Sequence, residues 1–362
     1  MTTNVPTSKC KTWLLYGANG YTGELIARHA FKLGLKPILA GRSAENLLPI
    51  TTKLKLPVRI FDLNNPSDLV NQLDDVDLVL NCAGPFSLTS KALVEACLSS
   101  KTHYLDITGE IDTFDYVLAQ QQRAIDAGIV LCSGVGFDVV PTDCIANTLK
   151  QALPDATHLE VGFSTPLIFS KGTLKTVIEG LPLGGKIRKH GQLVTVPQGW
   201  GAKRINFGQG KQWATTLPLG DVVTAFHSTQ IPNIRYYAAT HPAMLTTMKI
   251  SRLFHIFWQQ PSIIRGLQKL VDTTITGPSQ QQRENQTVYL WGQVFNAAGQ
   301  SKIATAQLSS IYQTTVHAGL AITQHLLKHS ISSGCYTPAQ LMGTDFISTL
   351  PECSPITISS PA

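Results

Sequence analysis

The stretch Trp13-Leu-Leu-Tyr-Gly-Ala-Asn-Gly-Tyr-Thr-Gly23 decides the fold of the first part of the chain. It begins with an apolar run typical of a buried strand, and helical periodicity follows from Glu24 to Leu33. Glycines between a strand and a helix permit a tight turn and let a backbone approach a pyrophosphate. The N–H groups at the start of the helix then attract phosphate. Unless this is a glycine-rich turn without a ligand, the residues that contact a dinucleotide are Gly17, Asn19, Gly20, Tyr21, Thr22 and Gly23.

Strands and helices alternate after this turn. Apolar runs with strand character occupy residues 37–40, 58–61, 76–81, 103–107 and 128–132. Stretches with helical periodicity lie between them, at 44–54, 66–73, 88–99 and 113–126. Strands that alternate with helices imply a parallel sheet with helices on both faces. We therefore predict an α/β fold that begins with a Rossmann-type, doubly wound parallel sheet.

The pattern changes after residue 156. Strand-like runs at 159–163, 192–196, 204–207 and 212–216 are joined by Gly/Pro turns, and a late hairpin is expected from 287–295 and 301–308. This pattern predicts a second α+β domain with a mixed sheet, followed by a helix over 310–328. The predicted domains are a cofactor-binding Rossmann domain at 1–145, a substrate or dimerisation domain at 146–308, and a C-terminal helical segment at 309–362 that packs back on the Rossmann domain.

The residues that follow the later strands indicate which dinucleotide is bound. The second strand ends at Arg42 and Ser43, where a protein that prefers NAD usually has an acid. Unless Arg42 is simply a surface residue, it can pair with a 2′-phosphate, and the Ser43 hydroxyl can add a donor, so we predict NADP(H). Asp62 ends the third strand and is expected beside the adenine, with a helix N-cap as the alternative. The residues expected beside the ribose and nicotinamide, unless they form only a tight turn, are Ala83, Gly84, Pro85 and Phe86.

Charge and cysteine usage narrow the class of protein. The 362 residues carry 29 Lys+Arg against 23 Asp+Glu, a net charge of +6, and only 14% are charged. The surplus lies in residues 151–270, which hold 13 basic and 4 acidic residues. These are scattered, without nucleic-acid-binding clusters or motifs, so no nucleic-acid partner is expected. The 7 Cys form no CxxC pair, and neither a signal peptide nor a run of about 18 apolar residues is visible, which predicts a cytoplasmic protein.

Several motifs follow one another in a specific order along the chain. They are Tyr16–Gly23, Leu39–Arg42, Asn81–Phe86, His103–Glu110, Gly136–Asp143, Gly172-Thr173, Gly277-Pro278 with Arg283, and Thr337–Asp345. In this order and spacing they resemble the saccharopine dehydrogenase-like oxidoreductases, a family that includes the trans-acting enoyl reductases. The resemblance implies an NADP-binding Rossmann domain and a second domain with a mixed sheet. It does not imply saccharopine as the substrate, because the arginine-rich carboxylate site of members that reduce imines of amino acids cannot be matched here residue by residue.

Hydride transfer from a nicotinamide to a substrate needs a proton donor near the ring, at the carboxyl ends of the strands. Asp106 and Glu110 follow the fifth strand and are catalytic candidates, with helix capping by Thr108 and Asp112 as the alternative. Asp138, in a glycine-flanked turn after the sixth strand, is the third candidate. Its alternative is a capped turn that crosses between domains.

Two further sets of residues are candidate ligand sites. Ser170-Lys-Gly-Thr173 is expected to bind an anionic group of the substrate, with simple helix capping as the alternative. His325 and His329 are four residues apart on an expected helix, but a pair without a third ligand is a poor metal site. No metal is therefore predicted.

The segment 222–271 contains no Asp or Glu and mixes apolar residues with Lys249, Arg252, Arg265 and Lys269. This pattern is typical of a peripheral membrane contact or a partner-binding helix, which we expect over 243–270. A homodimer interface or a core helix is the simpler explanation. With the resemblance, these features predict an NADPH-dependent oxidoreductase that reduces an apolar small molecule, lipid-like or carrier-bound. The alternative is a non-catalytic NADP-binding scaffold associated with lipid surfaces.

Overall fold

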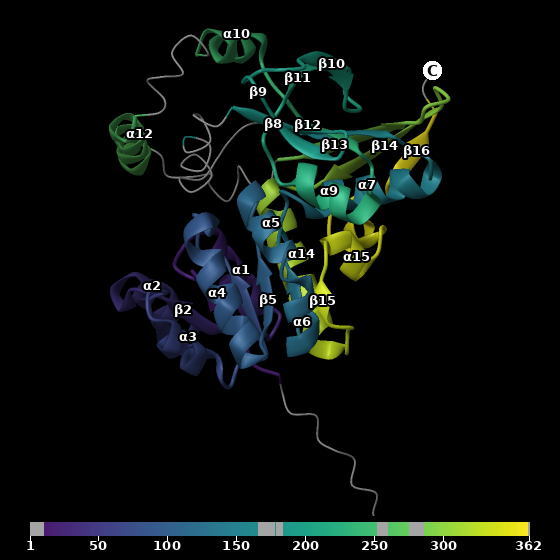
Figure 1. Cartoon of the computed structure of the whole chain (residues 1–362). Helices are drawn as coiled ribbons and strands as arrows, with labels where there is room; N and C mark the ends of the chain where they lie inside the picture. Colours follow the sequence, from purple (N-terminus) through teal and green to yellow (C-terminus); the bar gives the residue numbers. More distant parts are fainter. Residues whose placement is uncertain (1–10, 166–177, 179–183, 252–259, 275–285, 361–362) are drawn as a thin grey trace, which may run out of the picture.

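The computed structural model describes residues 11–165, 178, 184–251, 260–274 and 286–360. They form two bodies, each built around one β-sheet (Figure 1). The first body contains the N-terminal part of the chain and the second contains the middle part. The C-terminal residues contribute to both.

Seven parallel strands form the first sheet, in the order β15-β6-β5-β4-β1-β2-β3. The chain runs outward from β1 to β3 and then continues on the other side of β1, which is the doubly wound arrangement predicted from the sequence. The strands are β1 (Trp13–Tyr16), β2 (Ile38–Gly41), β3 (Val58–Ile60), β4 (Leu78–Asn81), β5 (His103–Asp106), β6 (Val130–Cys132) and β15 (Gly334–Cys335). The sequence did not indicate β15, because two residues are too few to show a hydrophobic period.

Helices connect these strands, and two of them begin after a residue whose side chain caps the helix N-terminus. Ser43 accepts from the Asn46 N–H at the start of α2, and Asn65 accepts from the Asp68 N–H at the start of α3. The helices are α1 (Tyr21–Lys32), α2 (Ala44–Leu54), α3 (Pro66–Leu73), α4 (Phe86–Ser100), α5 (Ile111–Leu118) and α6 (Gln121–Ala127).

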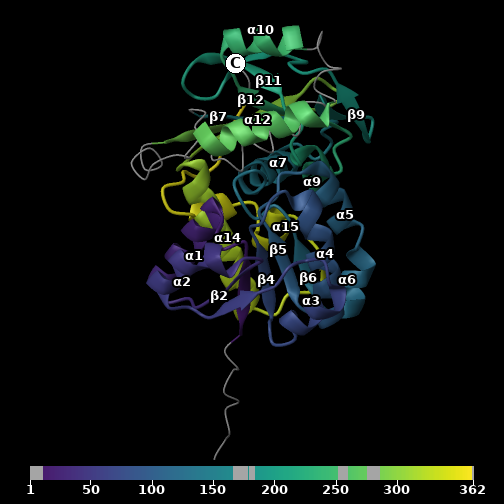
Figure 2. The same ribbon diagram turned by 90° about the vertical axis from the view of Figure 1, so that its left-hand side faces the viewer.

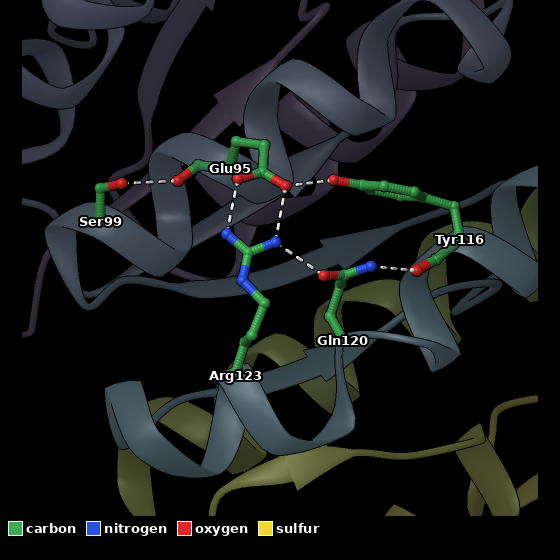
Figure 3. Close-up of polar contacts among 5 residues, drawn as sticks. All are labelled: Glu95, Ser99, Tyr116, Gln120 and Arg123. Carbon is green, nitrogen blue, oxygen red and sulfur yellow. Dashed lines mark hydrogen bonds and ion pairs between the residues drawn. The ribbon is translucent and has the colours of Figure 1, made fainter.

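The prediction of one helix over 113–126 was wrong, because α5 and α6 are separate helices with a break at Ala119 and Gln120. The Gln120 side chain donates to the Tyr116 carbonyl at the end of α5 and accepts from Arg123 in α6. Arg123 in turn pairs with Glu95 of α4 (Figure 3). Contacts that involve α4, α5 and α6 thus stabilise the break between the two helices. The hydrophobic periodicity of residues 113–126 does not indicate such contacts.

The second sheet is mixed, as predicted, and has the main order β10-β11-β12-β7-β13-β14-β16. Strand β7 runs parallel to β12 and antiparallel to β13. The strands are β7 (His158–Ser164), β8 (Gly185–Lys189), β9 (Gln192–Val196), β10 (Lys203–Asn206), β11 (Lys211–Thr216), β12 (Asn233–Ala239), β13 (Val288–Phe295), β14 (Ser301–Leu308) and β16 (Thr357–Ser359). Strands β8, β12 and β16 were not predicted.

Two helices cover the face of the second sheet that is turned toward the first body. Helix α7 (Val140–Ala152) packs on β13, β14 and β7, and α9 (Asp221–Thr229) packs on β12 and on α5. Figure 2 shows both helices between the second sheet and the first body. The domain boundary predicted at residue 145 falls within α7. Helix α7 therefore follows the last strand before the boundary, β6, in sequence but packs on the second sheet.

The C-terminal residues contact both bodies. Helix α14 (Ile311–Lys328) packs against α1, and β15 extends the first sheet beside β6. After α15 (Pro338–Met342), β16 pairs with β14 in the second sheet. The segment 309–362 thus contacts the second sheet as well as the Rossmann body. None of the described helices is both long and apolar enough to cross a bilayer.

Candidate functional site

The backbone of the glycine turn is packed so closely that Cβ atoms at two of its positions would clash with neighbouring atoms. Gly17 has φ +80° and donates its N–H to the Ala40 carbonyl at 2.9 Å. A Cβ on Gly17 would lie 2.7 Å from the Ala83 nitrogen, and one on Gly23 would lie 2.2 Å from the Gly17 oxygen. Both positions therefore require glycine. Around the turn, Asn19 is exposed, and Gly20, Tyr21 and Thr22 are half-buried at the N-terminus of α1.

Arg42 and Asp62 stand at the ends of the adjacent strands β2 and β3. Both are exposed, and both charges affect Tyr16: burial raises the pKa of its hydroxyl, Arg42 lowers it and Asp62 raises it. Arg42 makes no hydrogen bond or ion pair with any described residue, so its guanidinium is available to an anion. Ser43 uses its hydroxyl oxygen to cap α2.

The alternative interpretation of Asp62 as a helix N-cap was wrong, because Asn65 caps α3. The Asp62 carboxylate instead accepts from the Asn64 N–H at 2.8 Å, in the loop that precedes α3. This contact leaves Asp62 at the exposed end of β3, beside Arg42.

Glu110 has a role that the sequence did not indicate. Its carboxylate accepts from the Phe86 N–H at 2.8 Å and from the Ser87 N–H at 2.6 Å, at the start of α4. Two of the N–H groups that a helix leaves free at its N-terminus are thereby satisfied. Glu110 thus fixes the loop Ala83–Phe86, which passes the glycine turn at Gly17.

Asp106 is fully buried and surrounded by donors. One carboxylate oxygen accepts from the N–H groups of Thr108 and Gly134, both at 3.0 Å. The other accepts from the hydroxyls of Tyr104 at 2.9 Å and Ser133 at 2.8 Å. Burial raises the pKa of Asp106, while these donors lower it. The carboxylate ties the end of β5 to the loop after β6, and no exposed surface connects it to a substrate.

Asp138 lies at the junction of the two bodies, in the turn before α7. Its side chain is half-buried and makes no hydrogen bond with a described residue. A Cβ on Gly109 would lie 2.8 Å from its Oδ2, so the carboxyl group packs against the Gly109 backbone. Burial raises the pKa of Asp138 to about 6. A carboxyl group with this pKa is suited to proton transfer near neutral pH.

Asp221 and Tyr236 were missed by sequence reasoning. Asp221 begins α9 and is 1% exposed, and Tyr236 on β12 is 0% exposed. The Asp221 Oδ1 accepts a very short hydrogen bond from the Thr142 hydroxyl, but its Oδ2 and the Tyr236 hydroxyl have no partner among the described residues. Asp221 is an ordinary first-turn acid in sequence, and no motif distinguishes Tyr236 from other strand tyrosines.

An aromatic cluster lines the same junction. The Phe137 and Phe163 rings pack edge to face with centroids 5.3 Å apart, and Phe163 lies 6.1 Å from Tyr236. The Phe137 N–H donates to Thr315 of α14 at 3.0 Å. Phe137, which precedes Asp138 in the chain, thus packs on β7, and Phe163 of β7 packs on Tyr236 of β12.

The remaining predicted sites lie elsewhere. Ser170–Thr173 falls outside the described residues. Among those that the structure does describe, no three or more His, Cys, Asp or Glu are grouped as metal ligands. A surface pocket of about 410 Å³ is lined by Gln121, His227, Cys335, Tyr336 and Gln340. It contains no predicted site residue, so we place the site at the carboxyl ends of the strands of the first sheet.

Known proteins are similar to the first body and to parts of the remaining chain. Residues 13–132, from β1 to β6, match the family described as the saccharopine dehydrogenase NADP-binding domain. The mouse saccharopine dehydrogenase-like oxidoreductase is 28% identical over 203 residues, which cover 49% of this chain and 47% of that protein. The predicted family resemblance is confirmed. Residues 13–132 are thus similar to the NADP-binding domain of saccharopine dehydrogenases.

Two further proteins extend the likeness. A protein of Mycobacterium tuberculosis named as a trans-acting enoyl reductase is 29% identical over 182 residues, which cover 46% of this chain and 43% of that protein. These curated relatives are thus matched over less than half of their own length. The solved structure of apo saccharopine dehydrogenase (L-Glu forming) from Saccharomyces cerevisiae covers 97% of this chain with a TM-score of 0.66. The match includes 100% of the yeast chain. The two sequences are 13% identical, a level at which the likeness concerns the fold alone.

Proposed function

We propose that this chain binds NADPH and uses it to reduce an apolar substrate. The observation that carries the proposal is the pairing of the glycine turn with Arg42. Gly17 and Gly23 keep a backbone surface free of Cβ atoms at the N-terminus of α1, where a pyrophosphate fits. Arg42, exposed and free of described partners, is suited to a 2′-phosphate.

When bound, NADPH supplies a hydride from its nicotinamide ring. The chain positions that ring with the loop Ala83–Phe86, which Glu110 anchors through two hydrogen bonds. The start of α4 also offers apolar surface, since Phe86 is half-buried and Leu88 is 75% exposed. Glu110 is therefore a positioning residue in this proposal.

Asp138 is the proton donor in this proposal. It combines a raised pKa of about 6, partial exposure and a place at the carboxyl end of β6. Asp106 is fully buried among four donors, which suits a structural role. Of the three acids predicted from the sequence, Asp138 alone has both a free carboxyl group and an exposed side.

Cofactor binding can be tested by Arg42→Asp, with fluorescence titrations of NADPH and NADH. Loss of the 2′-phosphate contact should weaken NADPH binding by roughly 10- to 100-fold, because charge-assisted contacts contribute about 1.5–3 kcal/mol. NADH binding should change little. Arg59→Asp is a matched control, because Arg59 on β3 is already paired with Asp75. An unchanged NADPH/NADH ratio in Arg42→Asp would contradict the phosphate assignment.

The substrate class rests on the second body and on the relatives. Helices α10 (Pro242–Ser251) and α12 (Pro261–Thr274) lie at its outer edge (Figure 1). Met244, Ile250 and Leu270 there are 48%, 51% and 57% exposed. Basic residues accompany them, which suits an anionic, lipid-like or carrier-bound molecule. The enoyl reductase name of the mycobacterial relative favours an activated double bond as the reduced group.

Turnover can be measured as NADPH consumption with a panel of enoyl thioesters, aldehydes and ketones. We expect one class to react, and Asp138→Asn to lower kcat roughly 100-fold or more with unchanged NADPH affinity, because general-acid catalysis contributes about 10²–10⁴-fold. Tight NADPH binding without turnover on the whole panel would instead favour a non-catalytic NADP-binding scaffold.

Lipid or carrier contact needs a separate measurement. Wild-type protein and a Lys249/Arg265/Lys269→Glu variant can be compared for binding to anionic liposomes and to acyl carrier protein. We expect the wild type to bind one of them and the variant to lose that binding, since roughly 1 kcal/mol per basic residue comes from an anionic surface. Equal, negligible binding by both proteins would exclude this contact.

A further inference from the structure

The surroundings of Asp221 favour a neutral carboxylic acid. The group is 1% exposed, one oxygen has a single hydrogen bond from Thr142, and the other has no partner among the described residues. An ionised carboxylate with so little compensation is costly to bury. Burial therefore raises the pKa of Asp221 well above its ordinary value, and the charges of Asp138 and Asp143 raise it further. With Oδ1 accepting from Thr142, the oxygen without a described partner, Oδ2, is the one that can carry the proton of this acid.

Tyr236 supplies a second neutral hydroxyl beside the same acids. Burial is the largest cause that raises its pKa, and the charge of Asp138 raises it further. Its hydroxyl has no partner among the described residues, although the ring is fully buried. Buried hydroxyls without protein partners are usually bonded to internal water. Asp221 and Tyr236 belong to α9 and β12, which pack on each other, so one internal water can serve both groups.

The backbone brings Asp221 close to Asp138. The Gly220 N–H, next to Asp221, donates to the Gly109 carbonyl at 3.0 Å, and Gly109 packs against the Asp138 carboxyl group. The titratable groups on the surrounding elements are Asp106 and Glu110 after β5, Asp143 on α7, Asp221 on α9 and Tyr236 on β12. Asp106 and Asp143 are already satisfied by several donors, so the free O–H groups belong to Asp221 and Tyr236.

We propose that Asp221 and Tyr236 are positioning residues that hold one buried water behind Asp138, and that this water donates a hydrogen bond to the Asp138 carboxylate. The proposal rests on the assignment of Asp138 as the proton donor. Proton loss by Asp138 leaves a negative charge at the junction, and fixed neutral donors stabilise such a charge without reorganisation. Asp221 retains its own proton throughout, so no charge moves into the core.

The test is a titration of Asp138 in cofactor-free protein by carboxyl ¹³C NMR, with the resonance assigned from its loss in Asp138→Asn. We expect Tyr236→Phe to raise the titration midpoint by about one pH unit, because a hydrogen bond to the charged form favours that form. Asp221→Asn should leave the midpoint within about 0.3 unit, since it replaces one neutral donor by another and keeps an acceptor for Thr142. Tyr237→Phe is the matched control and should leave it unchanged.

Several results would overturn the proposal. An unchanged midpoint in Tyr236→Phe would show that its hydroxyl does not act on Asp138. A fall of about one unit in Asp221→Asn would show that Asp221 is ionised. A high-resolution crystal structure without a water in contact with Asp221 Oδ2 and the Tyr236 hydroxyl would exclude the shared ligand. None of these results touches NADPH binding or the loss of turnover in Asp138→Asn, so the two proposals can fail separately.

Discussion

Asp106 and Asp221 are equally hidden from solvent, at 0% and 1% exposure, but their surroundings are opposite. Asp106 accepts four hydrogen bonds from two strand-end loops, whereas Asp221 accepts one. Burial raises the pKa of both, and the four donors offset this effect at Asp106. The difference separates a carboxylate that ties two strand-end loops together from an acid with one oxygen that has no partner among the described residues. Burial alone would not have distinguished them.

The largest expected effect is that of Asp106→Asn. The amide keeps one acceptor oxygen and turns an NH₂ group toward the Tyr104 and Ser133 hydroxyls, which lose the oxygen that accepts their protons. We expect the free energy of unfolding to fall by about 3 kcal/mol, since each buried polar group left without a partner costs about 1–3 kcal/mol. Urea unfolding followed by circular dichroism measures this loss. Asp221→Asn, with its single hydrogen bond kept, is the control, and equal losses in both variants would remove the distinction.

Asp221→Asn should also change how stability depends on pH. A carboxyl group whose pKa is raised in the folded state binds its proton where the unfolded chain does not, so wild-type stability falls as pH rises above the unfolded value of about 4. The amide does not titrate. The variant should therefore gain stability relative to wild type between pH 4 and pH 8, measured as the difference in Tm. A constant difference over this range would mean that Asp221 is ionised in the folded protein without cost.

Tyr236 and Tyr237 repeat the comparison on one strand. Both are 0% exposed, but the Tyr237 hydroxyl bonds to Glu160 at 3.4 Å, while that of Tyr236 has no described protein partner. At about pH 5, where Asp138 is mostly protonated, we expect Tyr237→Phe to lower the free energy of unfolding by about 1 kcal/mol and Tyr236→Phe to change it by less than about 0.5 kcal/mol. Thermal unfolding of the two variants decides this, and a larger loss in Tyr236→Phe would reverse the assignment of partners.

The sequence indicated the features whose causes are local. The turn from Gly17 to Gly23 connects adjacent elements, and its glycines are explained by contacts within that turn and with Ala83. Arg42 follows β2 directly, so its place at the sheet edge follows from the strand itself. The alternation of strands and helices likewise repeats along the chain, and it predicted the parallel sheet.

The sequence could not indicate contacts between distant segments. Glu110 bonds the Phe86 N–H from 24 residues away, and no spacing rule connects a loop acid to the start of an earlier helix. Asp138, Asp221 and Tyr236 come from three elements that meet only when the second sheet packs on α7 and α9. Their shared surroundings depend on this long-range packing.

The smallest expected effect extends the comparison to the surface. Glu95 is also rich in donors, because Arg123 pairs with both of its oxygens at 2.8 and 2.7 Å and the Tyr116 hydroxyl adds a very short bond (Figure 3). The hydrogen bond from Arg123 is the main cause that lowers the pKa of Glu95 to about 2. The pair stabilises the folded state above about pH 4.5, and this contribution is lost as pH falls toward 2.

Both side chains of this pair are about half exposed, so solvent screens the interaction. We expect Glu95→Gln to lower the free energy of unfolding at pH 7 by no more than about 1 kcal/mol, and to have no effect near pH 2. Asp75→Asn, which breaks the pair with Arg59, is the surface control and should cost a similar amount. If Glu95→Gln cost as much as Asp106→Asn, the number of donors rather than burial would set the energy of a carboxylate in this fold.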